Sequence, residues 1–149
     1  MERLRVAATT AIVVAGALVI GIAAHDAPAA ASGSPNSVLN GVYRVQYTEK
    51  ELVSLGTSAA YAHRNYGVDT LWLSDGRYGV RQSRSPVGCS GSYSVSGRRV
   101  TFDFNVRHCN GIVTAAWTLR SGSLRFRVIS ATDPGDRTLF GSKPWKKIG

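Results

Sequence analysis

The chain has 149 residues, with 18 Lys and Arg against 9 Asp and Glu, a net charge of +9 at neutral pH and two cysteines. This length indicates one domain. So few carboxylates exclude an EF-hand-type calcium loop, and Cys89 and Cys109, with only His108 beside them, lack the spacing of a four-ligand metal site. We therefore expect no metal and no cofactor, and a positive charge of this size favours anionic partners.

The N-terminal segment has the features of an export signal. Arg3 and Arg5 precede residues 6–24, which carry no charge and are rich in Ala, Val, Ile and Gly. Small residues follow, and cleavage after Ala31 suits a signal peptidase. We predict a Sec-type signal peptide over residues 1–31, a flexible linker over 32–38 and a single domain over 39–149.

The alternative for the same segment is an uncleaved membrane anchor formed by residues 6–24, a length at the short end of what spans a bilayer. Both interpretations predict an exported protein, either secreted or held at the cell envelope. Export argues against nucleic acid as the natural partner.

The first elements of the predicted domain are a strand and a short helix. Tyr43, Val45 and Tyr47 alternate with polar residues and so lie on one face of a strand. Thr48 followed by Glu51 forms a capping box, which predicts one short helix directly after that strand.

The rest of the chain reads as short strands joined by tight turns. Turn signals occur at Asp75-Gly76, around Gly97 and at Ser121-Gly122, and a further turn is predicted over residues 133–136 before a last strand from Thr138 onward. About eight strands at this spacing predict an all-β, antiparallel, up-and-down meander that closes into a small barrel. A two-sheet β-sandwich is the alternative.

Two cysteines in an exported chain predict one disulfide, between Cys89 and Cys109. Strict alternation along the intervening hairpin would not make the two side chains face each other. We therefore expect a bulge or a strand end beside His108.

A set of aromatic residues falls on the faces expected to point inward. They either fill the barrel or line an interior pocket for a small apolar or aromatic ligand, because Tyr and Trp combine an apolar body with a polar tip. The candidate ligand-binding residues are Tyr43, Tyr47, Tyr78, Tyr93, Phe102, Trp117 and Phe126.

A set of basic residues falls on outward faces, in turns or in the C-terminal segment, with few acids among them. Arginine forms bidentate contacts with phosphate and carboxylate groups, so these side chains predict docking on an anionic lipid, cell-wall polymer or partner protein. The candidate residues are Arg98, Arg99, Arg107, Arg120, Arg125, Arg127, Lys146 and Lys147.

Catalytic motifs are missing from the sequence. It contains no Gly-x-Ser-x-Gly elbow, no His-Glu-x-x-His pair and no phosphate-binding Gly loop. Asp133 and Asp136 flank Pro-Gly and are interpreted as turn formers rather than paired acids. We expect a non-enzymatic monomer. The alternative is an enzyme with an unrecognised site around His63 or His108.

Short segments carry a resemblance to a known family. Residues 41–44 (Gly-Val-Tyr-Arg), 75–76 (Asp-Gly), 91–102, 133–136 and 143–145 (Lys-Pro-Trp) resemble a domain of exported actinobacterial proteins, which occurs alone or appended to solute-binding proteins of uptake systems. The resemblance covers most of residues 39–148. It implies a small barrel or half-barrel able to hold an interior pocket, without catalytic residues. The barrel is also distantly similar to lipocalin-like (calycin) barrels, which have Trp where this chain has Tyr43.

Overall fold

The computed structural model describes residues 34–85, 88–106 and 109–149. The predicted signal peptide, its alternative as an anchor, and the start of the predicted linker lie outside these residues. Within the described ranges, no helix is both long enough and apolar enough to cross a membrane.

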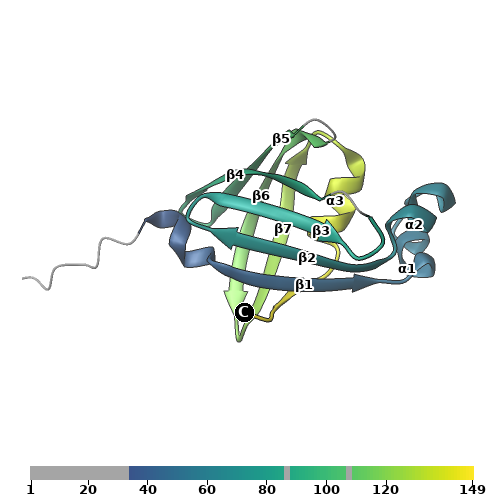
Figure 1. The fold of residues 1–149 in the computed structure, drawn as a ribbon, viewed down its shortest axis with the longest axis horizontal. Coiled ribbons are helices and arrows are strands. Elements are labelled where there is room, and N and C mark those ends of the chain that lie inside the picture. The colour runs from purple at the N-terminus through teal and green to yellow at the C-terminus, as the bar shows by residue number, and fades with distance from the viewer. Residues whose placement is uncertain (1–33, 86–87, 107–108) are drawn as a thin grey trace, which may run out of the picture. The chain divides into compact units, whose positions relative to one another are not determined.

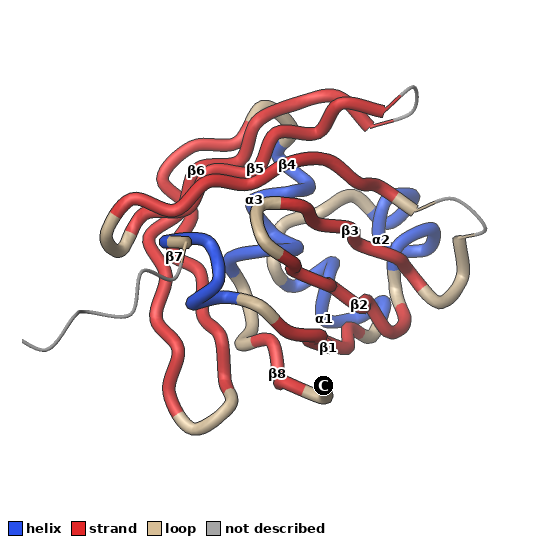
Figure 2. The backbone as a smooth tube through the Cα atoms, turned by 60° about the vertical axis from the view of Figure 1, so that its left-hand side comes forward, coloured by secondary structure: helices blue, strands red, loops and turns tan. Residues whose placement is uncertain are grey.

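Eight antiparallel strands in the described residues form a closed barrel in which each strand pairs with the next and the last pairs with the first (Figures 1 and 2). This confirms the predicted up-and-down meander. The strands are β1 (Gly41–Tyr47), β2 (Gly67–Ser74), β3 (Arg77–Gln82), β4 (Cys89–Ser96), β5 (Arg99–Val106), β6 (Cys109–Arg120), β7 (Ser123–Ala131) and β8 (Trp145–Lys147).

Two of the predicted turns have the backbone that tight hairpins require. Asp75 and Gly76 have φ angles of 45° and 89°, and Ser121 and Gly122 have 48° and 71°. Two consecutive positive φ angles match the right-handed twist of the flanking strands, so these dipeptides set the register of the β2–β3 and β6–β7 hairpins.

The barrel closes through a short seam. β8 has three residues, and its pairs with β1 are Lys147 with Tyr43 and Lys146 with Arg44. On its other side Trp145 pairs with Leu124 of β7. Pro144 directly precedes β8, where its missing N–H costs no ladder hydrogen bond.

The described helices lie near the ends of the barrel strands: η1 (Pro35–Leu39, a 3-10 helix), α1 (Glu49–Ser54), α2 (Ala59–Asn65) and α3 (Pro134–Gly141). The capping box of α1 is confirmed, because Thr48 and Glu51 exchange backbone and side-chain hydrogen bonds. The sequence did not predict α2, although Ser58 caps it by accepting a hydrogen bond from the N–H of Tyr61.

η1 begins within the segment predicted as a linker, and its amides attach it to the barrel. Asn36 Oδ1 accepts a hydrogen bond of 2.8 Å from the N–H of Val95 in β4. Asn40 exchanges two hydrogen bonds with Asp75 in the β2–β3 turn. The limits of the domain themselves stay predictions.

α3 corrects the prediction for the C-terminal region. Residues 133–136 were expected to form a turn and Thr138 to start a strand. Instead Asp133 caps a helix by accepting a 2.6 Å hydrogen bond from the N–H of Gly135, and Pro134 occupies the first turn. Proline fits there because its missing N–H is not needed at the start of a helix. Only residues 145–147 remain as the strand.

The helix α3 carries Phe140 into the barrel core. The Phe140 ring lies 5.2 Å from that of Phe102, 5.8 Å from Phe126 and 5.9 Å from Trp145. All four side chains are at most 4% exposed. A helix therefore supplies part of the interior that a pure meander would have to fill with strand residues.

The disulfide between Cys89 and Cys109 is confirmed, with a Cα–Cα distance of 5.7 Å. Each cysteine is the first residue of its strand, β4 and β6 respectively. A strand end, one of the two predicted arrangements, thus brings the side chains together. His108 itself lies outside the described residues.

Candidate anion-binding groove

Most of the predicted ligand-binding aromatics are core residues. Six of the seven are buried and Trp117 is half-buried. Three tyrosine hydroxyls donate hydrogen bonds to backbone carbonyls: Tyr43 to Leu39 at 2.9 Å, Tyr93 to Asn36 at 2.8 Å, and Tyr47 to the α3 backbone. These contacts fix η1 and α3 to the barrel.

Aromatic rings also contact one another inside the barrel. Tyr78 lies edge-on to Phe102 and Phe104, with ring centroids 5.1 and 5.3 Å away. Such edge-to-face pairs stabilise a packed interior. The aromatic cluster therefore has a structural role, whatever else it does.

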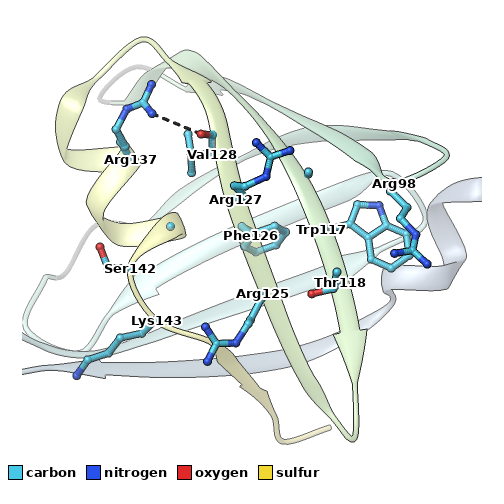
Figure 3. A pocket seen from close by; sticks show the side chains of 12 residues that line it. Arg98, Trp117, Thr118, Arg125, Phe126, Arg127, Val128, Arg137, Ser142 and Lys143 are labelled. Atoms are coloured by element: carbon cyan, nitrogen blue, oxygen red, sulfur yellow. Dashed lines mark hydrogen bonds between the residues drawn. The ribbon is translucent and has the colours of Figure 1, made fainter.

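The aromatic and basic predictions meet at an open groove of about 680 Å³ beside β6 and β7 (Figure 3). We call it the arginine groove. It is lined by residues from the β4–β5 turn, β6, β7, α3 and the segment after α3: Arg98, Ala116, Trp117, Thr118, Arg125, Phe126, Arg127, Val128, Arg137, Gly141, Ser142 and Lys143.

Strand alternation places the arginines of β7. Phe126 is 4% exposed and points into the core, so Arg125 and Arg127 on either side of it point outward and are exposed. Their register partners on β6 are Thr118 and Ala116, which carry no charge. The two arginines therefore lie on one face of the strand, and their Cα atoms are two residues of extended chain apart, about 7 Å.

Trp117 lies next to these arginines along the β6–β7 pair, opposite Phe126. Its backbone N–H donates a 2.9 Å hydrogen bond to the carbonyl of Arg98, which fixes the β4–β5 turn to the groove. Its indole Nε1 is buried and has no hydrogen-bond partner among the described residues.

α3 and the following segment supply the opposite side of the groove. The Arg137 guanidinium lies 3.4 Å from the carbonyl oxygens of Val128 and Ile129, which holds it against β7 (Figure 3). Lys143 Nζ lies 2.6 Å from Glu51 Oε1, so this cation already has a partner.

The groove has an unbalanced charge. Its lining contains four arginines and one lysine but no carboxylate. In the part of the chain that the structure describes, none of these four arginines forms an ion pair. Planar guanidinium groups that are not in an ion pair can bind phosphate or carboxylate groups by two parallel hydrogen bonds.

The predicted basic residues divide into several groups. Arg98, Arg125 and Arg127 meet in the groove, while Arg99 and Lys146 line neighbouring depressions. Lys147 donates a hydrogen bond to the carbonyl of Asn40. Arg120 is exposed at the end of β6, outside the groove, and Arg107 is outside the described residues.

The sequence did not indicate Arg137 as a basic site residue, and it placed Lys143 with Lys146 and Lys147 in a C-terminal basic cluster around Trp145 rather than beside Arg125. The positions of both in the groove depend on α3, where the sequence predicts a turn and a strand. The signal that could have located them is the Asp133-Pro134 pair, which starts a helix as readily as a turn.

The sequence reasoning also missed a buried acid. Asp69 is 1% exposed, on the inward face of β2 with Leu71, and its Oδ2 has no hydrogen-bond partner among the described residues. Burial raises the pKa of this carboxyl to about 7. Near it, burial and the charges of Asp136, Asp133 and Asp69 raise the pKa of Tyr61 to about 12.

Comparisons with known proteins identify no family for this chain. No family model matches it, and neither curated proteins nor solved structures show significant similarity to it. What is shown is the closed eight-stranded barrel, and the resemblances found in the sequence stay predictions.

Proposed function

We propose that this protein is a non-enzymatic, exported binding protein that holds an anionic ligand in the arginine groove. The observation that carries the proposal is the set of four arginines without ion pairs around one groove, which half-buried Trp117 also lines. Guanidinium groups would bind the phosphate or carboxylate groups, and the Trp117 ring would contact the uncharged part of the ligand.

The composition of the groove supports binding rather than catalysis. Its lining residues include no His, Cys, Asp or Glu that could act as a general acid or base. The disulfide between Cys89 and Cys109 supports export, because such bonds persist in oxidising compartments.

The hypothesis of a ligand inside the barrel has weaker support. It rests on the buried aromatic cluster, whose rings contact one another and whose tyrosine hydroxyls bind the backbone. Of the seven candidate residues, Trp117 and Phe126 line the groove. The groove therefore brings together two of the aromatic candidates and three of the basic ones, Arg98, Arg125 and Arg127.

The experiment compares two double variants, each of which removes two positive charges. R125Q/R127Q removes two groove arginines, and R77Q/R81Q removes two exposed arginines of β3 outside the groove lining. The probe is inositol hexakisphosphate, a compact polyanion, and the measurement is its dissociation constant by calorimetry at low salt.

We expect R125Q/R127Q to weaken binding about tenfold, because each exposed ion pair contributes up to about 1 kcal/mol, and R77Q/R81Q to leave it nearly unchanged. Circular dichroism checks that both variants are folded. Equal losses in the two variants, or no binding by the natural protein, would overturn the proposal.

A further inference from the structure

We propose that the arginine groove is the middle of a continuous basic band that binds an extended polyanion, a chain with a carbon backbone and repeated phosphate or carboxylate groups. This inference rests on the proposed function and adds the class of ligand to it.

The band continues from the groove toward the β4–β5 turn. A second depression, of about 390 Å³, shares Arg98, Ala116 and Arg127 with the groove and adds Arg99 and Ile129. Because three residues line both, a ligand in the groove can extend into this depression without leaving contact with arginine.

The band also continues in the other direction, toward the seam. A third depression, of about 360 Å³, shares Lys143 with the groove and adds Arg44 of β1 and Lys146 of β8. Its apolar lining includes Pro144 and Ile148. We define the basic band as the groove and these two depressions together.

The charge of the band is of one sign along its length. Eight cations line it and none of the lining residues is Asp or Glu. Lys143 alone among them is paired with a carboxylate in the described residues, through Glu51. The cations are Arg44, Arg98, Arg99, Arg125, Arg127, Arg137, Lys143 and Lys146.

Apolar side chains separate the cations. Trp117 and Val128 lie in the groove, Ile129 in the second depression and Ile148 in the third. Ile129 and Ile148 are 42% and 51% exposed, although aliphatic side chains are usually buried. A polymer whose charges are separated by carbon units would contact cations and apolar side chains in turn.

The course of the band around the barrel favours a flexible chain over a membrane surface. Its strand residues come from β4, β5, β6, β7, β8 and β1, which are successive neighbours in the closed barrel. A flat bilayer would touch only one side of such a curved surface, whereas an extended chain can follow the curve.

The test measures binding of poly-L-glutamate from the tetramer to chains of several dozen residues, with synthetic poly(glycerol phosphate) chains of several lengths as a second series. We expect affinity to rise with chain length until the band is filled, and to fall steeply with salt because each contact releases counterions. A preference between the two series distinguishes carboxylate from phosphate as the recognised group.

The variants separate the middle of the band from its ends. R44Q/K146Q changes one end and leaves the groove intact, whereas R125Q/R127Q changes the middle. We expect R44Q/K146Q to lower affinity for the longest chains about fivefold to tenfold while binding inositol hexakisphosphate normally, and R77Q/R81Q to change neither by more than about twofold.

The outcomes distinguish the two proposals. If long and short chains bind equally and R44Q/K146Q changes nothing, while R125Q/R127Q still weakens compact anions, the band is wrong and the groove stands. If R125Q/R127Q has no effect, both fail. If phosphatidylglycerol vesicles bound more tightly than any soluble chain at an equal concentration of negative charge, the proposal of a polymer ligand would be overturned in favour of a lipid surface.

Discussion

The ring of Phe140 in α3 lies 5.2 Å from the ring of Phe102 in β5, although α3 is outside the ladder of strands. Both side chains are fully buried. The helix thus fills the barrel from one side, and Phe140 joins it to the side chains that the strands direct inward. Stability of the barrel and the position of the groove wall on α3 depend on the same residue.

Replacing Phe140 with Ala should destabilise the protein by about 3–5 kcal/mol, because removing a buried ring leaves a cavity. Urea unfolding followed by circular dichroism measures the change. Phe140→Leu, which retains most of the volume, should cost clearly less. A loss below about 1 kcal/mol for Phe140→Ala would show that α3 is not part of the core.

Asp69 should make the protein more stable in mildly acidic solution than at neutral pH. Its pKa is raised to about 7 by burial, so the folded state binds the proton more tightly than the unfolded state. The stability gained from this proton is fully present below the unfolded pKa near 4. It is lost as the pH rises through about 7.

The variant that tests this is Asp69→Asn, which keeps the shape and removes the titration. Free energies of unfolding measured from pH 5 to 8 should fall by up to a few kcal/mol in the natural protein, and the slope should be smaller in the variant. Asp103→Asn, an exposed site on β5, should retain the full slope. A rise in the stability of the natural protein from pH 5 to 8 would contradict the raised pKa of Asp69.

Glu51 has the opposite pH dependence. Hydrogen bonds from Lys143 and then from Thr48 lower its pKa to about 2. The stability that its charge provides is present above its unfolded pKa and is lost as the pH falls through about 2.

Glu51→Gln should therefore melt at a lower temperature than the natural protein at pH 7. The difference should shrink as the pH approaches 2. Glutamine still completes a capping box, so Glu51→Ala should melt lower than Glu51→Gln at pH 7. Equal melting temperatures for all three proteins would show that neither the Lys143 pair nor the cap contributes.

Removing the disulfide by C89S/C109S should lower the free energy of unfolding by about 3 kcal/mol, because the bond restricts the unfolded chain. Chemical denaturation of the variant, compared with the natural protein under oxidising conditions, measures this. A reducing agent should lower the stability of the natural protein and leave C89S/C109S unchanged. If the reducing agent also lowered the stability of C89S/C109S, its effect on the natural protein could not be assigned to the disulfide.

The sequence predicted the strands well because side-chain direction along a strand has a period of two, which is a local property. Tyr43, Val45 and Tyr47 are buried as expected, and Arg125 and Arg127 are exposed on either side of buried Phe126. The turns followed from residues that accept positive φ.

Other features depend on contacts between distant parts of the chain. The Asp133-Pro134 pair is compatible with a turn or a helix. The helix is stabilised because Phe140 packs against aromatic rings of other elements. Asp69 shares the inward face of β2 with Leu71, so alternation could have indicated its burial, although the sequence analysis did not identify it. Its raised pKa depends on the whole barrel.

The groove could not be predicted from the aromatic and the basic residues taken separately. Trp117 and Arg125 were assigned to an interior and an outer surface respectively, and both line the same groove. Only the register of β6 with β7 and the position of α3 show that the two sets meet.

The short seam has a consequence for the order of folding. Contacts between successive strands join residues close in sequence, whereas the pairing of Tyr43 with Lys147 must close almost the whole domain. Such distant contacts carry the largest loop-closure cost, so we expect them to form late. Arg44 and Lys146 meet only at this step, so the third depression is a feature of the fully folded molecule. A chain bound across it would slow unfolding by holding the last-formed contact in place.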